Sequence, residues 1–342
     1  MEYGYYEQGG SPFKGRALEQ LKAFLLEMGL TYDEGIQYTT LVRNGEDEII
    51  AAASLQENVI KCIAVDDRCQ GEGLTGTLMT AIRREAMARK QRHLFLYTKP
   101  QNKMQFTALG FYEIAKTGSV LLMEDQRKGF ENWVESVRSA DAQGTIGALV
   151  MNCNPMTLGH RYLIEQAAAQ CDHLYLFVVS EDKSAVPAAD RRGIVEAGTA
   201  DLEHITVVGT DRYLISSATF PDYFLKDKSR SSAAWTELDV AVFCRLAKAL
   251  GITKRFVGTE PFCPVTNAYN AAMAEHLPEA GVELVQVPRL ERDGTAISAT
   301  AVRALVAEGR WQEIKSLVPQ ATYDYFSREE KREEFLSRIG NK

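Results

Sequence analysis

A short apolar run at residues 146–151 ends in a polar turn, and a helix-forming segment begins near residue 157. This order of strand, turn and helix places free backbone N–H groups and the positive end of a helix dipole beyond the end of a strand, where both favour an anion. Gly159 lets the backbone approach such a ligand, and His160 can donate a hydrogen bond to a phosphoryl oxygen. The stretch predicts a phosphate site, although an ordinary capped helix with a partly buried histidine would need the same residues.

Residues 297–303, Ile-Ser-Ala-Thr-Ala-Val-Arg, form a second candidate phosphate site. Ser298 stands where an N-cap is expected, ahead of a helix-forming segment that Gly309 would stop. Ser298 and Thr300 would supply donors to the β- and γ-phosphates of a nucleotide, and Arg303 would offset charge on a departing pyrophosphate. An ordinary capped helix with a solvated arginine is the plainer explanation.

The two motifs together resemble the TxGH and ISSTxxR elements of the nucleotidyltransferase superfamily, and they occur here in the order that this superfamily requires. The resemblance implies that both helix N-termini meet the phosphates of ATP in one site. It favours a shared function over two unrelated capped helices.

The composition fits a chain with two hydrophobic cores. The chain has 342 residues, is 45% hydrophobic and carries a formal net charge of −7. We expect no nucleic-acid partner because there is no basic tail or stripe, and no membrane partner because no apolar run approaches about 20 residues. The N-terminus lacks a signal-peptide pattern, and the six cysteines lack metal-site spacing, so we expect free thiols in a reducing cytoplasm.

Residues 1–126 are expected to form a first, α+β domain. Strands are predicted at 39–42, 48–55, 59–65, 93–98 and 120–123, and helices at 74–89 and 103–108. The loop with Arg68, Gly71 and Gly73 lies between a strand and a helix, where its N–H groups would form a nest for a pyrophosphate. This RxxGxG loop and the later Leu-Gly-Phe at 109–111 resemble elements of the GNAT acetyltransferases, which implies a GNAT-like fold. Glu57 and Glu113 are candidates for a general base only by residue type, so a module that binds a pantetheine-bearing partner without transfer stays open.

Residues 127–144 are expected to connect this domain to a second one at 145–342, through a short amphipathic helix at 130–138. Strands are predicted at 146–151, 174–179, 205–208, 255–257 and 282–287, and helices at 158–169, 189–199, 236–249, 269–276 and 299–307. This alternation predicts a Rossmann-like parallel α/β sheet with its ligand beyond the carboxyl ends of the strands. The charged helix expected at 327–338 is interpreted as a structural cap.

Over nearly its full length the chain resembles the citrate lyase ligase family, in which a GNAT-like domain precedes a nucleotidyltransferase-like domain. The stretches that carry the resemblance are 151–163, 197–202, 218–226, 255–258 and 297–303. One departure is Gly258-Thr259-Glu260-Pro261, where the family is expected to have Gly-Glu-Glu-Pro.

The resemblance implies an AMP-forming acid–thiol ligase. ATP and acetate would give acetyl-adenylate and pyrophosphate, and the phosphopantetheine-type thiol on the acyl carrier subunit of citrate lyase would then take the acetyl group. ATP and Mg²⁺ would be the cofactors, with the metal held mostly by phosphate and water and no protein metal ligand predicted. A CoA or phosphopantetheine-type group is implied at the GNAT-like domain.

Residue roles follow from the same resemblance. His160, Thr157 and Arg303 are the candidate catalytic residues, and Asn152, Asn154, Gly159, Gly258, Ser298 and Thr300 are the candidate nucleotide ligands. Lys226 could reach a phosphate or the substrate carboxylate, and Arg191 and Arg192 could contact the nucleotide, but a surface position is the plainer interpretation of all three. The residues that could line the cleft are Asn267, Tyr269 and Asn270. Cys153, inside the first motif, has no evident base and is not expected to act as a nucleophile.

Three alternatives share parts of this pattern. A phosphopantetheine- or mononucleotide-type adenylyltransferase would use the same two motifs, but it would make a dinucleotide where a ligase releases AMP. An acetyl-CoA-dependent N-acetyltransferase would transfer acetyl groups without ATP. A nucleotide-responsive binding protein would bind ATP without turnover.

Overall fold

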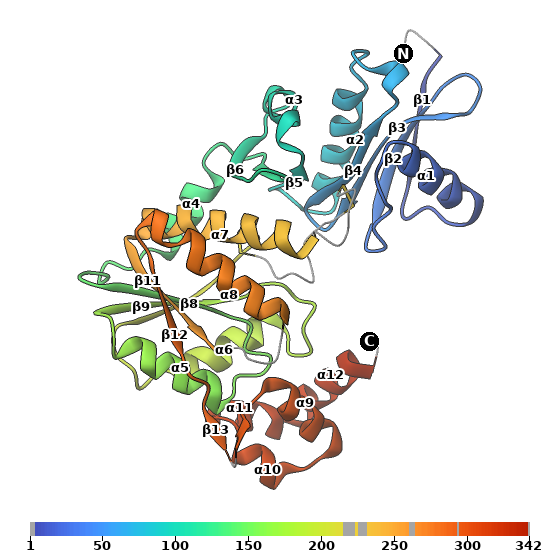
Figure 1. Cartoon of the computed structure of the whole chain (residues 1–342). Helices are drawn as coiled ribbons and strands as arrows, with labels where there is room; N and C mark the ends of the chain where they lie inside the picture. The colour runs from blue at the N-terminus through green and yellow to red at the C-terminus, as the bar shows by residue number, and fades with distance from the viewer. Residues whose placement is uncertain (1–3, 215–222, 225–230, 260–263, 293, 341–342) are drawn as a thin grey trace. The chain divides into compact units, whose positions relative to one another are not determined.

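The computed structural model describes residues 4–214, 223–224, 231–259, 264–292 and 294–340 (Figure 1). The chain divides into two compact units: unit 1 comprises Met1–Asn132 and Thr219–Ala241, and unit 2 comprises Trp133–Ala218 and Val242–Lys342. The predicted domain limits of 1–126 and 145–342 stay a prediction. The division also shows that the segment 219–241 belongs to unit 1, and no sequence pattern indicated that the chain returns to the first unit.

Unit 1 is built on a seven-stranded sheet in the order β1-β2-β3-β4-β5-β7-β6. Neighbouring strands are antiparallel except β4 and β5, which are parallel. The strands are β1 (Tyr6–Gly10), β2 (Tyr38–Arg43), β3 (Ile49–Gln56), β4 (Val59–Val65), β5 (Phe95–Thr98), β6 (Tyr112–Lys116) and β7 (Leu121–Glu124). The helices within this unit are α1 (Gly15–Glu27), α2 (Leu74–Ala88) and α3 (Lys103–Ala108), while α4 (Gly129–Val137) and α7 (Ser231–Leu250) contain residues of both units.

The core of unit 1 lies where α1 and α2 pack against β3. Leu74, Leu78 and Ile82 recur at helical spacing along α2 and are buried, as expected for an amphipathic helix that covers a sheet. The alanines of 51–53 in β3 are fully buried. Because alternate side chains of a strand point to opposite faces, these short side chains leave room for helices on both faces of β3.

The parallel pair at the centre of this sheet separates along its length. β4 and β5 pair through Val59–Phe95 and Ile60–Leu96, at the first residues of both strands. The parts of the two strands that follow, including Ala64 and Thr98, line a pocket. Divergence of the two strands therefore creates a binding space within a continuous sheet.

Unit 2 contains a five-stranded sheet in the order β10-β9-β8-β11-β12, with all neighbouring strands parallel. Counted from its first strand, the order is 3-2-1-4-5, the doubly wound Rossmann order, in which ligands bind beyond the carboxyl ends of the strands where the order reverses. That point lies between β8 and β11. The strands are β8 (Ile146–Met151), β9 (His173–Val178), β10 (Ile205–Gly209), β11 (Ile252–Gly258) and β12 (Glu283–Val287), and a short hairpin follows with β13 (Glu291–Arg292) and β14 (Thr295–Ala296).

The helices at the C-terminus share the core of unit 2. Buried residues of β8 and β9 form one cluster with Val302, Ile314, Phe326 and Phe335, and Figure 1 shows α9 to α12 as a compact orange-to-red group. The helices within this unit are α5 (Leu158–Ala168), α6 (Ala188–Gly198), α8 (Pro264–His276), α9 (Ala299–Glu308), α10 (Trp311–Lys315), α11 (Gln320–Ser327) and α12 (Glu329–Gly340). The C-terminal helices are therefore part of the domain core, which gives the predicted cap a structural role.

The predicted fold class is confirmed: a GNAT-like α+β unit is combined with a Rossmann-like parallel α/β unit. The sequence analysis missed α1, β1, β6, α10 and α11. β1 ends in two glycines, which disfavour a strand, and it is held by pairing with β2 at the sheet edge. Within the described part of the chain, no helix combines the length and apolarity that a membrane span needs. Cys62, Cys69, Cys153, Cys171 and Cys244 are free thiols, and Cys263 lies outside the described residues.

Candidate functional site

The first predicted motif forms the N-terminus of α5, directly beyond the carboxyl end of β8. Thr157 is the N-cap, and its hydroxyl oxygen accepts a hydrogen bond from the backbone N–H of His160 at 3.3 Å. In return, the Nδ1 atom of His160 accepts from the backbone N–H of Thr157 at 3.0 Å. The two residues thus cap the helix reciprocally, as a capping box does with Ser or Thr and Glu.

This geometry assigns the proton on the His160 ring. A backbone N–H can only donate, so Nδ1 is the acceptor, and a neutral ring then carries its proton on Nε2. Burial, with a smaller contribution from the charge of Arg289, lowers the pKa of His160 to about 4. His160 is therefore neutral at pH 7, and its Nε2–H is a donor whose direction the capping box fixes.

The backbone donors at this helix start are partly used. The N–H of Leu158 donates to the carbonyl oxygen of Leu317 at 2.8 Å, and the N–H of His160 is held by Thr157. A Cβ added to Gly159 would lie 3.0 Å from the carbonyl oxygen of Ile297. Gly159 therefore permits close approach of Ile297, the first residue of the second motif, which is a different reason for a glycine from the phosphate contact that the sequence suggested.

The second predicted motif forms the N-terminus of α9, as expected. Ser298 is the N-cap and accepts a hydrogen bond from the N–H of Ala301 at 3.1 Å. Arg303 donates to the hydroxyl oxygen of Thr300 at 2.9 Å and to the carbonyl oxygen of Asn154 at 2.7 Å. Partial burial lowers the pKa of Arg303. The Arg303–Asn154 bond joins the two motifs, which lie about 150 residues apart in the chain.

Asn152 and Asn154 occupy the turn between β8 and α5, and α6 supports this turn. The N–H of Val186 donates to the side-chain oxygen of Asn154 at 2.9 Å. Arg191 donates to the carbonyl oxygen of Asn152 at 2.9 Å, to its side-chain oxygen, and to the carbonyl oxygen of Val186 at 3.1 Å. Arg191 is completely buried, which corrects the prediction of a surface position. Its guanidinium instead holds the turn between β8 and α5 through these hydrogen bonds.

Arg192, by contrast, is exposed and pairs with Glu196 on the same helix. Lys226 and the matching stretch at 218–221 lie outside the described residues. Asn267 is exposed, whereas Asn270 is buried and donates to the carbonyl oxygen of Gly258 at 3.3 Å.

The ends of β11 and β12 add a residue that the sequence analysis missed. Gly258 ends β11, and the next residue, Thr259, donates its N–H to the carbonyl oxygen of Val287 at 2.9 Å. Arg289 follows β12 and donates to the carbonyl oxygen of Thr259 at 2.9 Å. Its charge is close enough to lower the pKa of His160. The sequence signal that could have identified Arg289 is its place two positions beyond the parallel strand predicted at 282–287.

Cys153 lies in the same turn and is 1% exposed. Burial raises the pKa of its thiol to about 12. Because only the thiolate is a strong nucleophile, Cys153 is a packing residue at neutral pH, in agreement with the sequence analysis.

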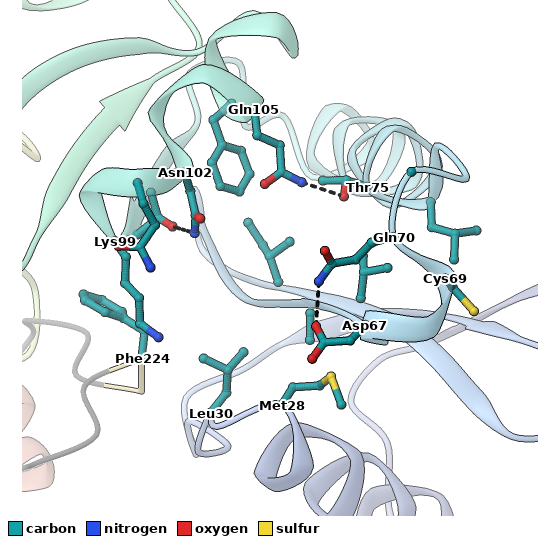
Figure 2. Close-up of a pocket in the computed structure, with 18 of the residues that line it drawn as sticks. Met28, Leu30, Asp67, Cys69, Gln70, Thr75, Lys99, Asn102, Gln105 and Phe224 are labelled. Atoms are coloured by element: carbon teal, nitrogen blue, oxygen red, sulfur yellow. Dashed lines mark hydrogen bonds between the residues drawn. The ribbon is translucent and has the colours of Figure 1, made fainter.

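A second candidate site is a pocket of about 610 Å³ in unit 1. Gly71 and Gly73 line it, with backbone φ angles of +89° and +76°, and Gly73 is the N-cap of α2. Arg68, the third predicted residue of this loop, instead forms an ion pair with Asp66 at 2.6 Å. Figure 2 shows the polar side chains of Gln70, Thr75, Asn102 and Gln105 around the pocket.

Comparison with known proteins supplies the family. Residues 146–326 match the family described as citrate lyase ligase C-terminal domain. A citrate (pro-3S)-lyase ligase of Escherichia coli K12 is 41% identical over 321 residues, which cover 91% of this chain and 91% of that protein. The chain belongs to the citrate lyase ligase family. A family member from Haemophilus influenzae Rd is 39% identical over 321 residues, covering 92% of this chain and 96% of that protein.

Among solved structures, an acyl-CoA N-acyltransferase from Pseudomonas aeruginosa aligns with 36% of this chain and 99% of its own, with 13% sequence identity and a TM-score of 0.32. The strand order of unit 1 and its parallel β4–β5 pair by themselves indicate a GNAT-like fold. As a member of the citrate lyase ligase family the chain is an enzyme, and the adenylyltransferase and N-acetyltransferase alternatives are not favoured. The unusual Thr259 acts through its backbone groups in the described contacts, so the departure from Glu leaves these contacts unchanged.

Proposed function

We propose that this chain activates citrate lyase by ATP-dependent acetylation of the prosthetic-group thiol on its acyl carrier subunit, with acetyl-adenylate as the intermediate. A carboxylate oxygen of acetate attacks the α-phosphorus of ATP, and pyrophosphate leaves. The carrier thiol then attacks the acetyl carbon, loses its proton and releases AMP. The observation that carries the proposal is the hydrogen bond from Arg303 to the Asn154 carbonyl, because it brings the two phosphate motifs to one place.

His160 is the proposed donor to the reacting phosphate. Its neutral ring presents Nε2–H while Nδ1 is held by Thr157. A donor fixed before the reaction loses little orientation free energy when negative charge grows on the phosphoryl oxygen. Acetate is already ionised at neutral pH, so the first step needs no protein base and rests on positioning and charge stabilisation.

The remaining nucleotide contacts divide between the two motifs. Asn152, Asn154 and Gly258, at the ends of β8 and β11, would hold the α-phosphate and the nucleoside. Ser298, Thr300 and Arg303 would hold the β- and γ-phosphates, with Arg289 as a further cation near His160. Mg²⁺ would be held mostly by phosphate oxygens and water, and its charge would offset that of the leaving pyrophosphate.

The pocket of unit 1 is the proposed site for a pantetheine-type arm. Gly71 and Gly73 adopt left-handed conformations at the start of α2 and line the pocket, and their backbone N–H groups would bind a phosphate as anion-binding nests do. A phosphate at this helix start would place the extended arm between β4 and β5. The arm belongs to the carrier subunit or to free CoA, which share this chemistry.

Pyrophosphate release from ATP, Mg²⁺ and acetate tests the proposal, measured with and without thiol-form citrate lyase. We expect AMP as the nucleotide product and recovery of lyase activity when the carrier is present. A dinucleotide product would support an adenylyltransferase, and acetyl transfer from acetyl-CoA to an amine without ATP would support an N-acetyltransferase. No pyrophosphate release under either condition would exclude the ligase reaction.

A further inference from the structure

Two aromatic residues from a distant part of the chain close one side of the unit 1 pocket. Tyr223 and Phe224 both line the pocket and are 4% and 3% exposed. They precede α7, whereas the other lining residues come from the first 106 residues of the chain. The two side chains pack edge to face, with ring centroids 5.3 Å apart.

This aromatic pair is fastened to unit 1 by directed hydrogen bonds. The Tyr223 hydroxyl donates to the carbonyl oxygen of Tyr97 in β5 at 3.1 Å. The carbonyl oxygen of Tyr223 accepts from the N–H of Thr31 at 2.9 Å. Contacts at both the side chain and the backbone give the pair a defined position, which an incidental surface contact would not need.

Phe224 lies opposite the proposed phosphate end of the pocket. Figure 2 shows Phe224, Leu30 and Lys99 on one side, and Cys69 and Gln70, which neighbour the glycine loop, on the other. A phosphate bound at Gly71 and Gly73 would therefore direct the thiol end of a pantetheine arm toward Phe224. Leu30 adds an apolar side chain to this end of the pocket, beside the ammonium group of Lys99.

The groups around this end are suited to packing. The Tyr223 hydroxyl is a committed donor, and burial raises its pKa well above the ordinary value. The nearby Cys62 thiol donates to the carbonyl oxygen of Thr31 at 3.5 Å, and burial raises its pKa to about 12. Neither group is a base at neutral pH. This region therefore limits the size of an incoming acyl group and supplies no base for its transfer.

We propose that Tyr223 and Phe224 form an end wall that determines the acyl-group specificity of the pantetheine site, an inference that rests on the function proposed above for this pocket. They admit a free thiol or a short acyl thioester such as acetyl and exclude long acyl chains. The wall would match the site to the product of this ligase, because an acetylated arm fits where a longer thioester collides with Phe224.

The test is calorimetric titration of the full chain with CoA, acetyl-CoA and octanoyl-CoA. We expect CoA and acetyl-CoA to bind with similar affinity and octanoyl-CoA at least about tenfold more weakly, since small pockets discriminate by about that factor per added group. Phe224→Ala opens the wall and should bring octanoyl-CoA to within a few-fold of acetyl-CoA. Phe224→Leu preserves most of the side-chain volume and should keep the wild-type preference.

Met104→Ala is the matched control, because Met104 is 78% exposed and lies outside the pocket lining. Equal binding of acetyl-CoA and octanoyl-CoA by the wild type would contradict the proposed role of the end wall. Unchanged selectivity in a folded Phe224→Ala protein would contradict it as well. Absence of CoA binding would contradict the proposed pantetheine site itself.

Pyrophosphate release without carrier is measured on the same samples. A failure of the proposed end wall is thereby distinguished from a failure of the proposed ligase reaction. Displacement of CoA by thiol-form citrate lyase, if seen, identifies the carrier arm as the ligand, and failure to displace identifies free CoA; the wall stands in both cases.

Discussion

The helix starts of α2 and α5 follow parallel strands in two different sheets, yet they present different donors. α2 begins at Gly73, which has no side chain and adopts a φ of +76°. α5 begins at Thr157, whose hydroxyl and N–H are both engaged with His160. The first start exposes backbone, whereas the second covers its backbone and offers a ring N–H in its place.

This contrast fits the two tasks that we propose. Backbone N–H groups form a fixed nest that suits a phosphate held without reaction. A histidine side chain can be aimed at the atom where charge develops, and its effect is then largest in the transition state. The two sites should therefore respond differently to substitution: α2 in binding, and α5 in rate.

The largest expected effect is at His160. His160→Ala removes the Nε2 donor and should lower kcat for pyrophosphate release about 100- to 1,000-fold, as loss of a transition-state donor does elsewhere. KM for ATP should change only a few-fold, because the donor acts mainly on the transition state. Steady-state pyrophosphate release with ATP, Mg²⁺ and acetate measures both constants.

His204→Asn is the control for this histidine substitution. His204 is an exposed histidine with a φ of +58°, and asparagine tolerates that conformation. The control should retain wild-type kcat. A folded His160→Ala protein with unchanged kcat would remove His160 from the proposed reaction.

Arg303 tests whether the two motifs of unit 2 act as one site. Arg303→Lys keeps the charge but cannot donate to both Asn154 and Thr300 in the same planar geometry. Loss of one charged hydrogen bond should lower kcat/KM for ATP roughly tenfold to 100-fold. CoA binding at unit 1 should stay unchanged, measured by titration of the same protein. Equal losses in both assays would indicate general destabilisation in place of a local role.

Much of this arrangement could be predicted from the sequence, and the exceptions have physical causes. The caps at Thr157 and Ser298 were predictable because they depend on local hydrogen bonds within one turn. The position of Arg191 was predicted wrongly because its helix pattern does not reveal that the carbonyl groups of Asn152 and Val186 accept hydrogen bonds from its guanidinium. The insertion of Tyr223 and Phe224 into unit 1 was not predictable, since it depends on contacts with residues more than 100 positions away.

Gly73 tests the backbone side of the comparison. Gly73→Ala places a Cβ on a left-handed residue and should destabilise the protein by about 1 kcal/mol. The shifted N–H groups should weaken CoA binding, while pyrophosphate release without carrier stays within a few-fold of wild type. Gly193→Ala is the matched control: Gly193 lies inside α6 with open space around it, so alanine there should slightly stabilise the protein. Unaltered CoA affinity in Gly73→Ala would show that α2 does not bind the phosphate.

The smallest expected effect is in the pH dependence of stability, and it separates the two helix starts again. The pKa of His160 is about 4 in the folded protein against an ordinary value of 6.5, so the unfolded chain binds this proton first as the pH falls. Stability is lost progressively between pH 6.5 and 4, because protonation of Nδ1 breaks its bond from the Thr157 N–H. Wild type should therefore lose a few degrees more in Tm from pH 7 to pH 5 than His160→Asn, in which this titration is absent.

Arg289→Gln removes the cation that also lowers the pKa of His160, so its Tm should fall less than that of wild type over the same pH range. His173, whose pKa burial also lowers, is present in all three proteins and cancels in the comparison. Identical changes in Tm for wild type and His160→Asn would mean that the ring is not held neutral by its capping contact, and the assignment of Nε2–H as the donor at α5 would fail with it.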